Sequence, residues 1–242
     1  MAWLRSALYM LFLVVTVIPY ALACMLWAPL PLRWRYRLTV GWPRLAIWGA
    51  RVIVGIRWRV VGAENLPNGP AIVLSKHQSA WETLFLPFYL PRQVCFVYKR
   101  ELNLVPFFGW GLALLRMISI DRSRGHDAFA QVVEQGRRRL AEGAWPVLFP
   151  EGTRTPPGQA GRYKMGGALL ASRTGVPVIP IAHNAGECWP RNAFIKTPGL
   201  VTVCIGPAIE SQGIPPEELN RKVQDWIEAE MRRLNPERYD QS

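Results

Sequence analysis

The chain has 242 residues, a formal net charge of +12 and a pI of about 10.1, and apolar residues make up 50% of it. This length is enough for one sizeable α/β domain and excludes two comfortable ones. The cysteines are scattered, with no CxxC pair and no histidine at ligand spacing, which argues against a zinc site and a disulfide framework and fits a reducing compartment.

The basic charge is concentrated near the N-terminus, and its distribution decides between two classes of partner. Nucleic acid and an anionic membrane both suit a strongly basic chain. No Asp or Glu precedes Glu64, and the arginines between Arg5 and Arg59 are interleaved with tryptophans. Indole rings favour headgroup depth and guanidinium groups bind lipid phosphate, so we expect an anionic membrane surface as partner and no nucleic acid.

Residues 6–32 carry no charge, and this run exceeds the roughly 20 residues that cross a bilayer as a helix. Pro19, Pro29 and Pro31 interrupt it, so the run fits two arrangements equally well. One is a kinked or re-entrant segment followed by an interfacial helix, and the other is one straight span. A signal peptide cleaved near Ala23 is a rival interpretation. We expect residues 1–60 to form a membrane-embedded or interfacial helical segment in the inner, cytoplasmic membrane. The arginines after Leu32 then predict an active site on the cytoplasmic face.

Beyond this segment, strand and helix patterns alternate. Short β-branched, aromatic or aliphatic runs predict strands at residues 57–61, 71–74, 94–98, 117–120, 145–149, 176–182 and 200–205. Apolar or amphipathic stretches predict helices that start at residue 80 and occupy residues 106–115, 127–142, 166–174 and 216–234. Alternating strands and helices predict an α/β layered sheet with flanking helices over residues 61–242.

The stretch SKHQSAWETL at residues 75–84 places a histidine, a serine and a carboxylate where a strand gives way to a helix. Ser79 and Glu82 have capping-box spacing: the Ser79 hydroxyl accepts the Glu82 N–H and the Glu82 carboxylate accepts the Ser79 N–H. His77 then lies on the strand-to-helix connection, where open α/β sheets place reactive groups. In one interpretation His77 is a general base that folds back over the helix start, and Glu82 holds its ring. In the other, Glu82 is only a cap and His77 only a polar loop residue.

A second stretch, FPEGTRTPPGQAGRY at residues 149–163, again follows a strand directly. Its glycines and prolines predict a bent loop whose backbone can approach a ligand closely. Arg154 offers a planar fork of donors for phosphate or carboxylate, and Lys99 and Arg100 end a neighbouring predicted strand. These cations predict an anion site. For the loop alone, a surface turn with a solvated arginine is the alternative.

Together these stretches resemble the sequence blocks of the 1-acylglycerol-3-phosphate acyltransferase family of glycerolipid synthesis. His77 to Glu82 resembles its His-x4-Asp block, and KRELNLVPFFGWG from Lys99, FPEGTR from Phe149 and VPVIPIAHN from Val176 are similar to the other three blocks. The resemblance covers residues 71–184, and four blocks in order are far more specific than any one. The family's fold is an α/β acyltransferase domain behind an N-terminal membrane-embedded two-helix element.

The resemblance implies transfer of a fatty acyl group from a thioester to the 2-hydroxyl of lysophosphatidic acid, which gives phosphatidic acid. It implies no cofactor and no metal, with acyl-CoA or acyl carrier protein as the donor substrate. By position, His77 is the base and Glu82 its orienting carboxylate. The substrate-binding positions that it implies are Lys99, Arg100, Glu151, Gly152, Thr153 and Arg154. The family pattern usually has Asp where this chain has Glu82.

Other interpretations stay open from the residues. Backbone N–H groups near Ser79 are candidates to stabilise the tetrahedral oxyanion, and Ser79 as a nucleophile is a sharper alternative. The acceptor could be another lyso-lipid, such as lyso-ornithine lipid, which does not need Arg154. A non-catalytic anionic-lipid-binding protein is the third possibility, and it would tolerate loss of His77.

Overall fold

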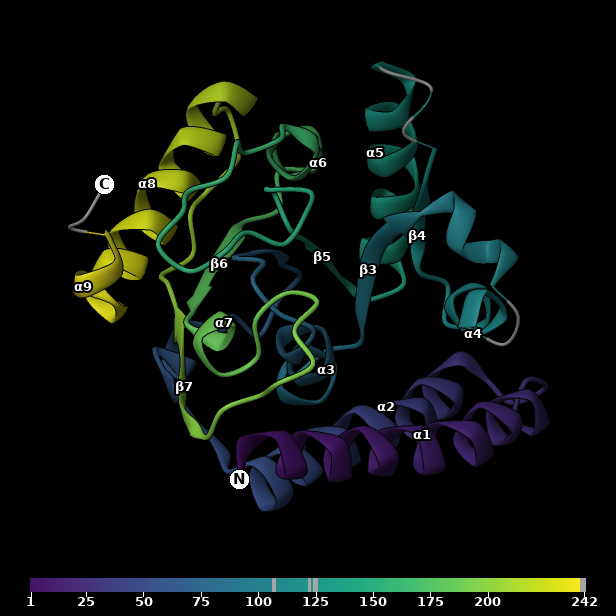
Figure 1. Cartoon of the computed structure of the whole chain (residues 1–242). Helices are drawn as coiled ribbons and strands as arrows, with labels where there is room; N and C mark the ends of the chain where they lie inside the picture. Colours follow the sequence, from purple (N-terminus) through teal and green to yellow (C-terminus); the bar gives the residue numbers. More distant parts are fainter. Residues whose placement is uncertain (106–107, 122, 124–125, 240–242) are drawn as a thin grey trace.

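The strands pair into a seven-stranded sheet in the order β1-β7-β6-β2-β5-β3-β4 (Figure 1). The computed structural model describes residues 1–105, 108–121, 123 and 126–239. In this part of the chain the strands are β1 (Ile56–Val61), β2 (Ile72–Ser75), β3 (Val94–Lys99), β4 (Ile118–Ile120), β5 (Trp145–Leu148), β6 (Val178–His183) and β7 (Gly199–Ile205). Among these strands β6 and β7 pair antiparallel, and the other strand pairs are parallel. The predicted α/β layered fold is confirmed.

The register of the central strands brings two loops together. Strand β2 lies between β6 and β5, and Val73 pairs with Val147 in a parallel ladder. Parallel neighbours end at the same edge of a sheet, so the chain leaves β2 and β5 side by side. The segments that follow are the two stretches that the sequence singles out, around His77 and Glu151.

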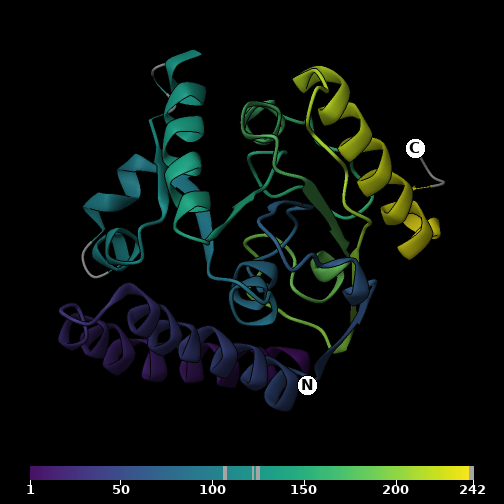
Figure 2. The same ribbon diagram turned by 180° about the vertical axis from the view of Figure 1, so that it is seen from behind.

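Helices cover both faces of the sheet (Figures 1 and 2). Beyond β1, the described helices are α3 (Trp81–Tyr89), α4 (Phe108–Leu114), α5 (His126–Ala141), α6 (Gly166–Thr174), α7 (Ala185–Cys188), α8 (Pro216–Leu234) and α9 (Pro236–Tyr239). The predictions for α6 and α8 match the structure at both ends. Pro106 and Phe107, which open the predicted 106–115 helix, lie outside the described residues.

Two apolar cores form, one on each face of the sheet. Successive strand residues point to opposite faces, so β2 contributes to both. Val73 packs in the core that contains Trp81 of α3, whereas Leu74 packs in the core that contains Leu170 of α6 and Val223 of α8. Helices therefore pack against both faces of β2 and hold it in place.

The N-terminal segment folds into two helices and a π-helical turn, which are α1 (Ala2–Leu26), α2 (Leu32–Gly49) and Ala50–Val54. The two helices are antiparallel, because the Tyr20 hydroxyl donates to the Leu38 carbonyl and the Tyr9 hydroxyl donates to the Ala46 carbonyl. They lie side by side along one end of the α/β part, next to α3 and α4 (Figures 1 and 2). The segment is therefore a helical hairpin.

Helix α1 is long and apolar enough to cross a membrane, with a mean hydropathy of 2.2 over its most apolar window. Only 6% of that window is buried in the protein. A helix that served as the core of a soluble protein would be mostly covered, so the exposed apolar surface of α1 indicates membrane association. The helices end at Val54, and β1 already pairs with β7, so the sheet begins slightly before the boundary predicted at residue 60.

Candidate active site

The imidazole of His77 and the carboxylate of Glu82 are in direct contact. His77 Nδ1 lies 2.7 Å from Glu82 Oε1. Helix α3 begins only at Trp81, so His77 lies in the segment before the helix and folds back over its start. The same Oε1 accepts the backbone N–H groups of Ser79 at 3.0 Å and Gln78 at 3.2 Å. The geometry that the base interpretation requires is therefore present.

Only half of the predicted capping box forms. Glu82 accepts the Ser79 N–H, but Ser79 Oγ accepts the N–H of Trp81 at 3.1 Å instead of that of Glu82. The N–H groups of Gln78, Ser79 and Trp81 are thus occupied by side-chain oxygens, so the prediction that the N–H groups near Ser79 bind an oxyanion is wrong for these three. Ser79 is also fully buried, which argues against it as a nucleophile.

Glu82 is ionised although it is buried. Desolvation alone would raise the pKa of its carboxyl group. The neighbouring His183, the hydrogen bond and charge of His77, and the Ser79 N–H outweigh desolvation, so the pKa of Glu82 lies below its ordinary value. A negative charge is therefore held against the His77 ring.

His183 supports the same loop from the adjacent strand β6. Its Nδ1 accepts the N–H of Ala185 at 3.3 Å, so Nε2 carries the proton and donates to the Lys76 carbonyl at 2.8 Å. Burial lowers the pKa of His183 below its ordinary value. Its Nε2 is 3.9 Å from Glu82 Oε2.

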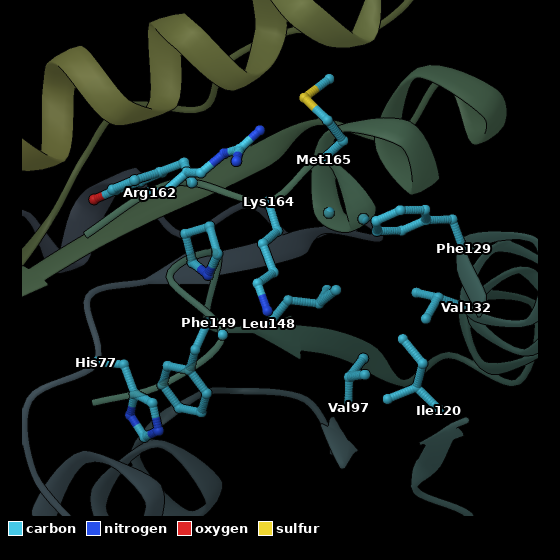
Figure 3. A pocket seen from close by; sticks show the side chains of 15 residues that line it. His77, Val97, Ile120, Phe129, Val132, Leu148, Phe149, Arg162, Lys164 and Met165 are labelled. Carbon is cyan, nitrogen blue, oxygen red and sulfur yellow. The ribbon is translucent and has the colours of Figure 1, made fainter. Parts of the chain in front are cut away.

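An apolar pocket with a volume of about 680 Å³ opens beside His77 (Figure 3). Its apolar wall comes from β3, β4, β5, α5 and the start of α6, and includes Val97, Ile120, Phe129, Val132, Leu148 and Met165. Phe149 stacks on the His77 ring at a centroid distance of 4.0 Å and an angle of 17°. Two cations, Arg162 and Lys164, also line the pocket, and Lys164 points into it in Figure 3.

Glu151 lies at the centre of a buried network. Its Oε1 is 2.6 Å from Lys76 Nζ and accepts the Thr155 hydroxyl at 2.8 Å, and its Oε2 accepts the His77 N–H at 2.9 Å. The Thr155 N–H in turn donates to the His77 carbonyl at 2.8 Å. These bonds join the two loops along the His77 backbone and place Glu151 behind the histidine.

The remaining predicted substrate-binding residues surround this centre less closely. Gly152 lines the pocket with a φ of +69°, and a Cβ there would meet Lys164 Nζ at 2.7 Å. Thr153 is exposed. The Arg154 carbonyl accepts a hydrogen bond from Arg191 at 3.0 Å.

Lys99 and Arg100 are exposed at the end of β3. Alternate strand residues share a face, so Lys99 emerges on the same side as the pocket residue Val97. Arg100 makes an ion pair of 3.5 Å with Asp121. Whether these two residues bind substrate stays a prediction.

Several residues of the site are absent from the sequence-based prediction. Lys76 directly precedes the first block and Phe149 is the first residue of the FPEGTR block, but a lysine between a strand and a histidine suggests a solvated side chain. Arg162 lies near the end of the second stretch and Lys164 directly follows it, and their position on the pocket wall depends on how this segment folds. The signal in the sequence was that all four lie within or next to the two stretches at residues 75–84 and 149–163.

Comparison with known proteins agrees with this geometry. The Acyltransferase family matches residues 57–184. The chain is 47% identical to the 1-acyl-sn-glycerol-3-phosphate acyltransferase of Pseudomonas aeruginosa, across 96% of this chain and 92% of that protein. The chain belongs to the 1-acyl-sn-glycerol-3-phosphate acyltransferase family. Membership makes it an enzyme of the acyltransferase class.

More distant members of the acyltransferase family extend the comparison. The 1-acyl-sn-glycerol-3-phosphate acyltransferase alpha of Mus musculus is 31% identical over 73% of this chain and 63% of that protein. The crystal structure of the 1-acyl-sn-glycerophosphate acyltransferase of Thermotoga maritima has a TM-score of 0.79. It covers 97% of this chain and 98% of that chain at 23% identity, so it supports the fold.

Proposed function

We propose that this acyltransferase moves a fatty acyl group from an acyl thioester to the 2-hydroxyl of lysophosphatidic acid and so forms phosphatidic acid. The observation that carries the proposal is the His77–Glu82 pair at the wall of an apolar pocket that also contains cations. A base, an apolar channel and positive charge are what an acyl chain and a phosphorylated acceptor require. The names of the similar enzymes support the same reaction.

His77 acts as the general base in this proposal. Glu82 accepts a hydrogen bond from Nδ1, so Nε2 is the nitrogen left to take the proton of the acceptor hydroxyl. The hydroxyl oxygen then attacks the thioester carbonyl, and the tetrahedral intermediate collapses to the ester as the C–S bond breaks. The departing thiolate then takes the proton from His77, which restores the neutral base. A thioester is already activated, so no acyl-enzyme is needed, and the base contributes ~10²- to 10⁴-fold.

The pocket receives the acyl chain and its cations receive the phosphate. Phe149 holds the His77 ring flat against the apolar wall, so a chain in the pocket ends beside the base. Lys164 and Arg162 line the same pocket, and Lys99 and Arg154 supply further positive charge close by. The donor thioester comes from acyl-CoA or acyl carrier protein.

The membrane presents the lipid acceptor to this site. The outer surface of α1 exposes apolar side chains. The α/β part also exposes large apolar side chains, which are Leu104, Val105, Phe108, Trp110, Phe194 and Ile195. Arg33 and Arg37 flank the exposed Trp34 ring on α2, which suits lipid headgroups. We place the protein at the inner, cytoplasmic membrane with the active site on the cytoplasmic face.

Cysteine labelling tests the membrane contact. In vesicles, Phe108→Cys and Phe194→Cys should resist a water-soluble maleimide, whereas Lys222→Cys on the exposed side of α8 should react. Equal labelling of all three would place these residues in water.

The test of the reaction is acyl transfer by the purified, detergent-solubilised protein, with acyl-CoA and acyl carrier protein donors side by side. We expect phosphatidic acid from the wild type and a loss of at least ~10²-fold in His77→Ala. His183→Ala is the comparison that separates a base from a supporting histidine, and it should lose less. No product with either donor, on an acceptor that still binds, would refute the proposal and direct the assay to other lyso-lipids.

A further inference from the structure

Lys76 is a fully buried lysine immediately before His77. Its Nζ is 2.6 Å from Glu151 Oε1 and 2.9 Å from Glu228 Oε1, and it donates to the Gln159 carbonyl at 3.1 Å. Lysine is almost never fully buried unless it is paired, and here one ammonium faces two carboxylates. The proposed chemistry does not use this group.

The ammonium connects directly to the backbone of the base. Glu151 holds Lys76 through Oε1 and the His77 N–H through Oε2. The peptide of Lys76 is itself fixed, because its N–H donates to the Ile181 carbonyl at 2.8 Å and its carbonyl accepts from His183. Glu151 is therefore the route by which a change at the Lys76 side chain reaches the His77 backbone.

The other end of the network lies on helix α8, far along the chain. Glu228 is 4% exposed and accepts both Lys76 and the Tyr163 hydroxyl, each at 2.9 Å. Its neighbours Ile227 and Met231 are fully buried, and α8 packs over β6. Helix α8 is therefore rigidly seated when it presents this carboxylate to the loop.

We propose that Lys76 and Glu228 are positioning residues, which fasten the C-terminal helix α8 to the backbone of His77 through Glu151. The proposal rests on the proposed role of His77 as the base. Small displacements of a reacting group are costly, since a shift of about 1 Å can reduce turnover ~10²-fold. A buried cation between two carboxylates resists such a shift because each partner, left alone, is an uncompensated buried charge.

The test measures Glu228→Leu, Lys76→Met and the double variant that combines these two changes. Glu230→Leu is the control for all three. Glu230 is the matched control, since it lies on the same helix and its carboxylate pairs with the exposed Arg233. At a temperature where all variants are folded, we expect kcat to fall ~10-fold or more in each single variant with an acceptor KM close to that of the wild type. Glu230→Leu should keep both.

The double variant should regain turnover relative to Lys76→Met. In Lys76→Met two buried carboxylates lose their cation. In the double variant only Glu151 remains, and Thr155, Gly161 and the His77 N–H still donate to it. Recovery of kcat above that of Lys76→Met supports the coupling. Simple addition of the two losses contradicts it.

A second measurement is independent of turnover. The His77 side chain is 14% exposed, so its rate of modification by diethyl pyrocarbonate, followed by peptide mass spectrometry, reports how the ring is held. We expect faster modification in Glu228→Leu and no change in Glu230→Leu. Unchanged kcat and unchanged modification in both single variants, with only a lower melting temperature, would overturn the positioning role. If the wild type is inactive, but modification of His77 is still faster in Glu228→Leu and unchanged in Glu230→Leu, the proposed reaction is rejected and the positioning role stands.

Discussion

Replacing Glu82 by glutamine keeps the shape of the buried side chain and removes its charge. Glu82 Oε1 accepts from His77 Nδ1, Ser79 N–H and Gln78 N–H. A glutamine carbonyl oxygen can accept the same three donors, so we expect the loop before α3 to keep its conformation. What changes is the attraction between the carboxylate and the imidazolium that forms when His77 takes a proton.

The size of this loss follows from the geometry. Two unit charges about 4 Å apart attract by about 4 kcal/mol at an effective dielectric constant of 20. The Nδ1–Oε1 distance of 2.7 Å brings the groups within this range, while the 14% exposure of the His77 side chain allows some screening by water. A loss of about 3 kcal/mol in the transition state corresponds to roughly a hundredfold lower kcat, at 1.36 kcal/mol for each factor of ten.

The assay is the initial rate of phosphatidic acid formation at saturating donor and acceptor. Glu134→Gln is the matched control, because it makes the same change at an exposed carboxylate paired with Arg138. We expect the control to retain the wild-type kcat, since exposed pairs contribute little. A Glu82→Gln variant that folds normally and turns over within about threefold of the wild type would refute the reasoning.

Three further changes test other parts of the site. Desolvation lowers the pKa of His183 below its ordinary 6.5, so the unfolded chain binds a proton that the folded protein does not. Stability should therefore fall as pH drops below about 6.5, and His183→Gln should flatten this slope of melting temperature against pH; parallel slopes would contradict it. Val132→Phe narrows the pocket and should lower kcat/KM ~10-fold for long-chain donors relative to medium-chain ones in a competition assay, whereas an equal loss for both would remove Val132 from the acyl channel. Lys164→Met should raise the KM for lysophosphatidic acid ~10-fold, with Lys222→Met on α8 as the neutral control, and a KM that does not change would exclude contact with the phosphate.

Local patterns predicted the strands and the longer helices of the α/β part, but not the short helices α7 and α9. Helix α8 starts with Pro216, has Glu217 and Glu218 in its first turn and ends with two arginines, and its predicted ends match the structure. Helix α6 ends where Gly175 adopts a left-handed φ of +67°. These signals act within one or two turns, so a single sequence contains them completely.

The contact between His77 and Glu82 was predicted for the same reason, with one error in the hydrogen bonds around it. His77 and Glu82 are five positions apart, and the capping signal correctly placed the histidine before the helix. The hydroxyl of Ser79 nevertheless bonds the Trp81 N–H. Two hydrogen-bond patterns are compatible with one short sequence, and the packing of the buried loop selects between them.

Residues close together in the chain were enough to predict an apolar N-terminal helical segment and the alternation of strands and helices. They also singled out the two loops around His77 and Glu151. Packing between distant parts of the chain brings α1 and α2 into a hairpin, places β2 between β5 and β6, and brings Lys76 to Glu228, 152 positions away. A buried lysine and a solvated lysine look alike in sequence. The difference is the desolvation of the ammonium, and it exists only once the sheet, the loop and the C-terminal helix have closed around it.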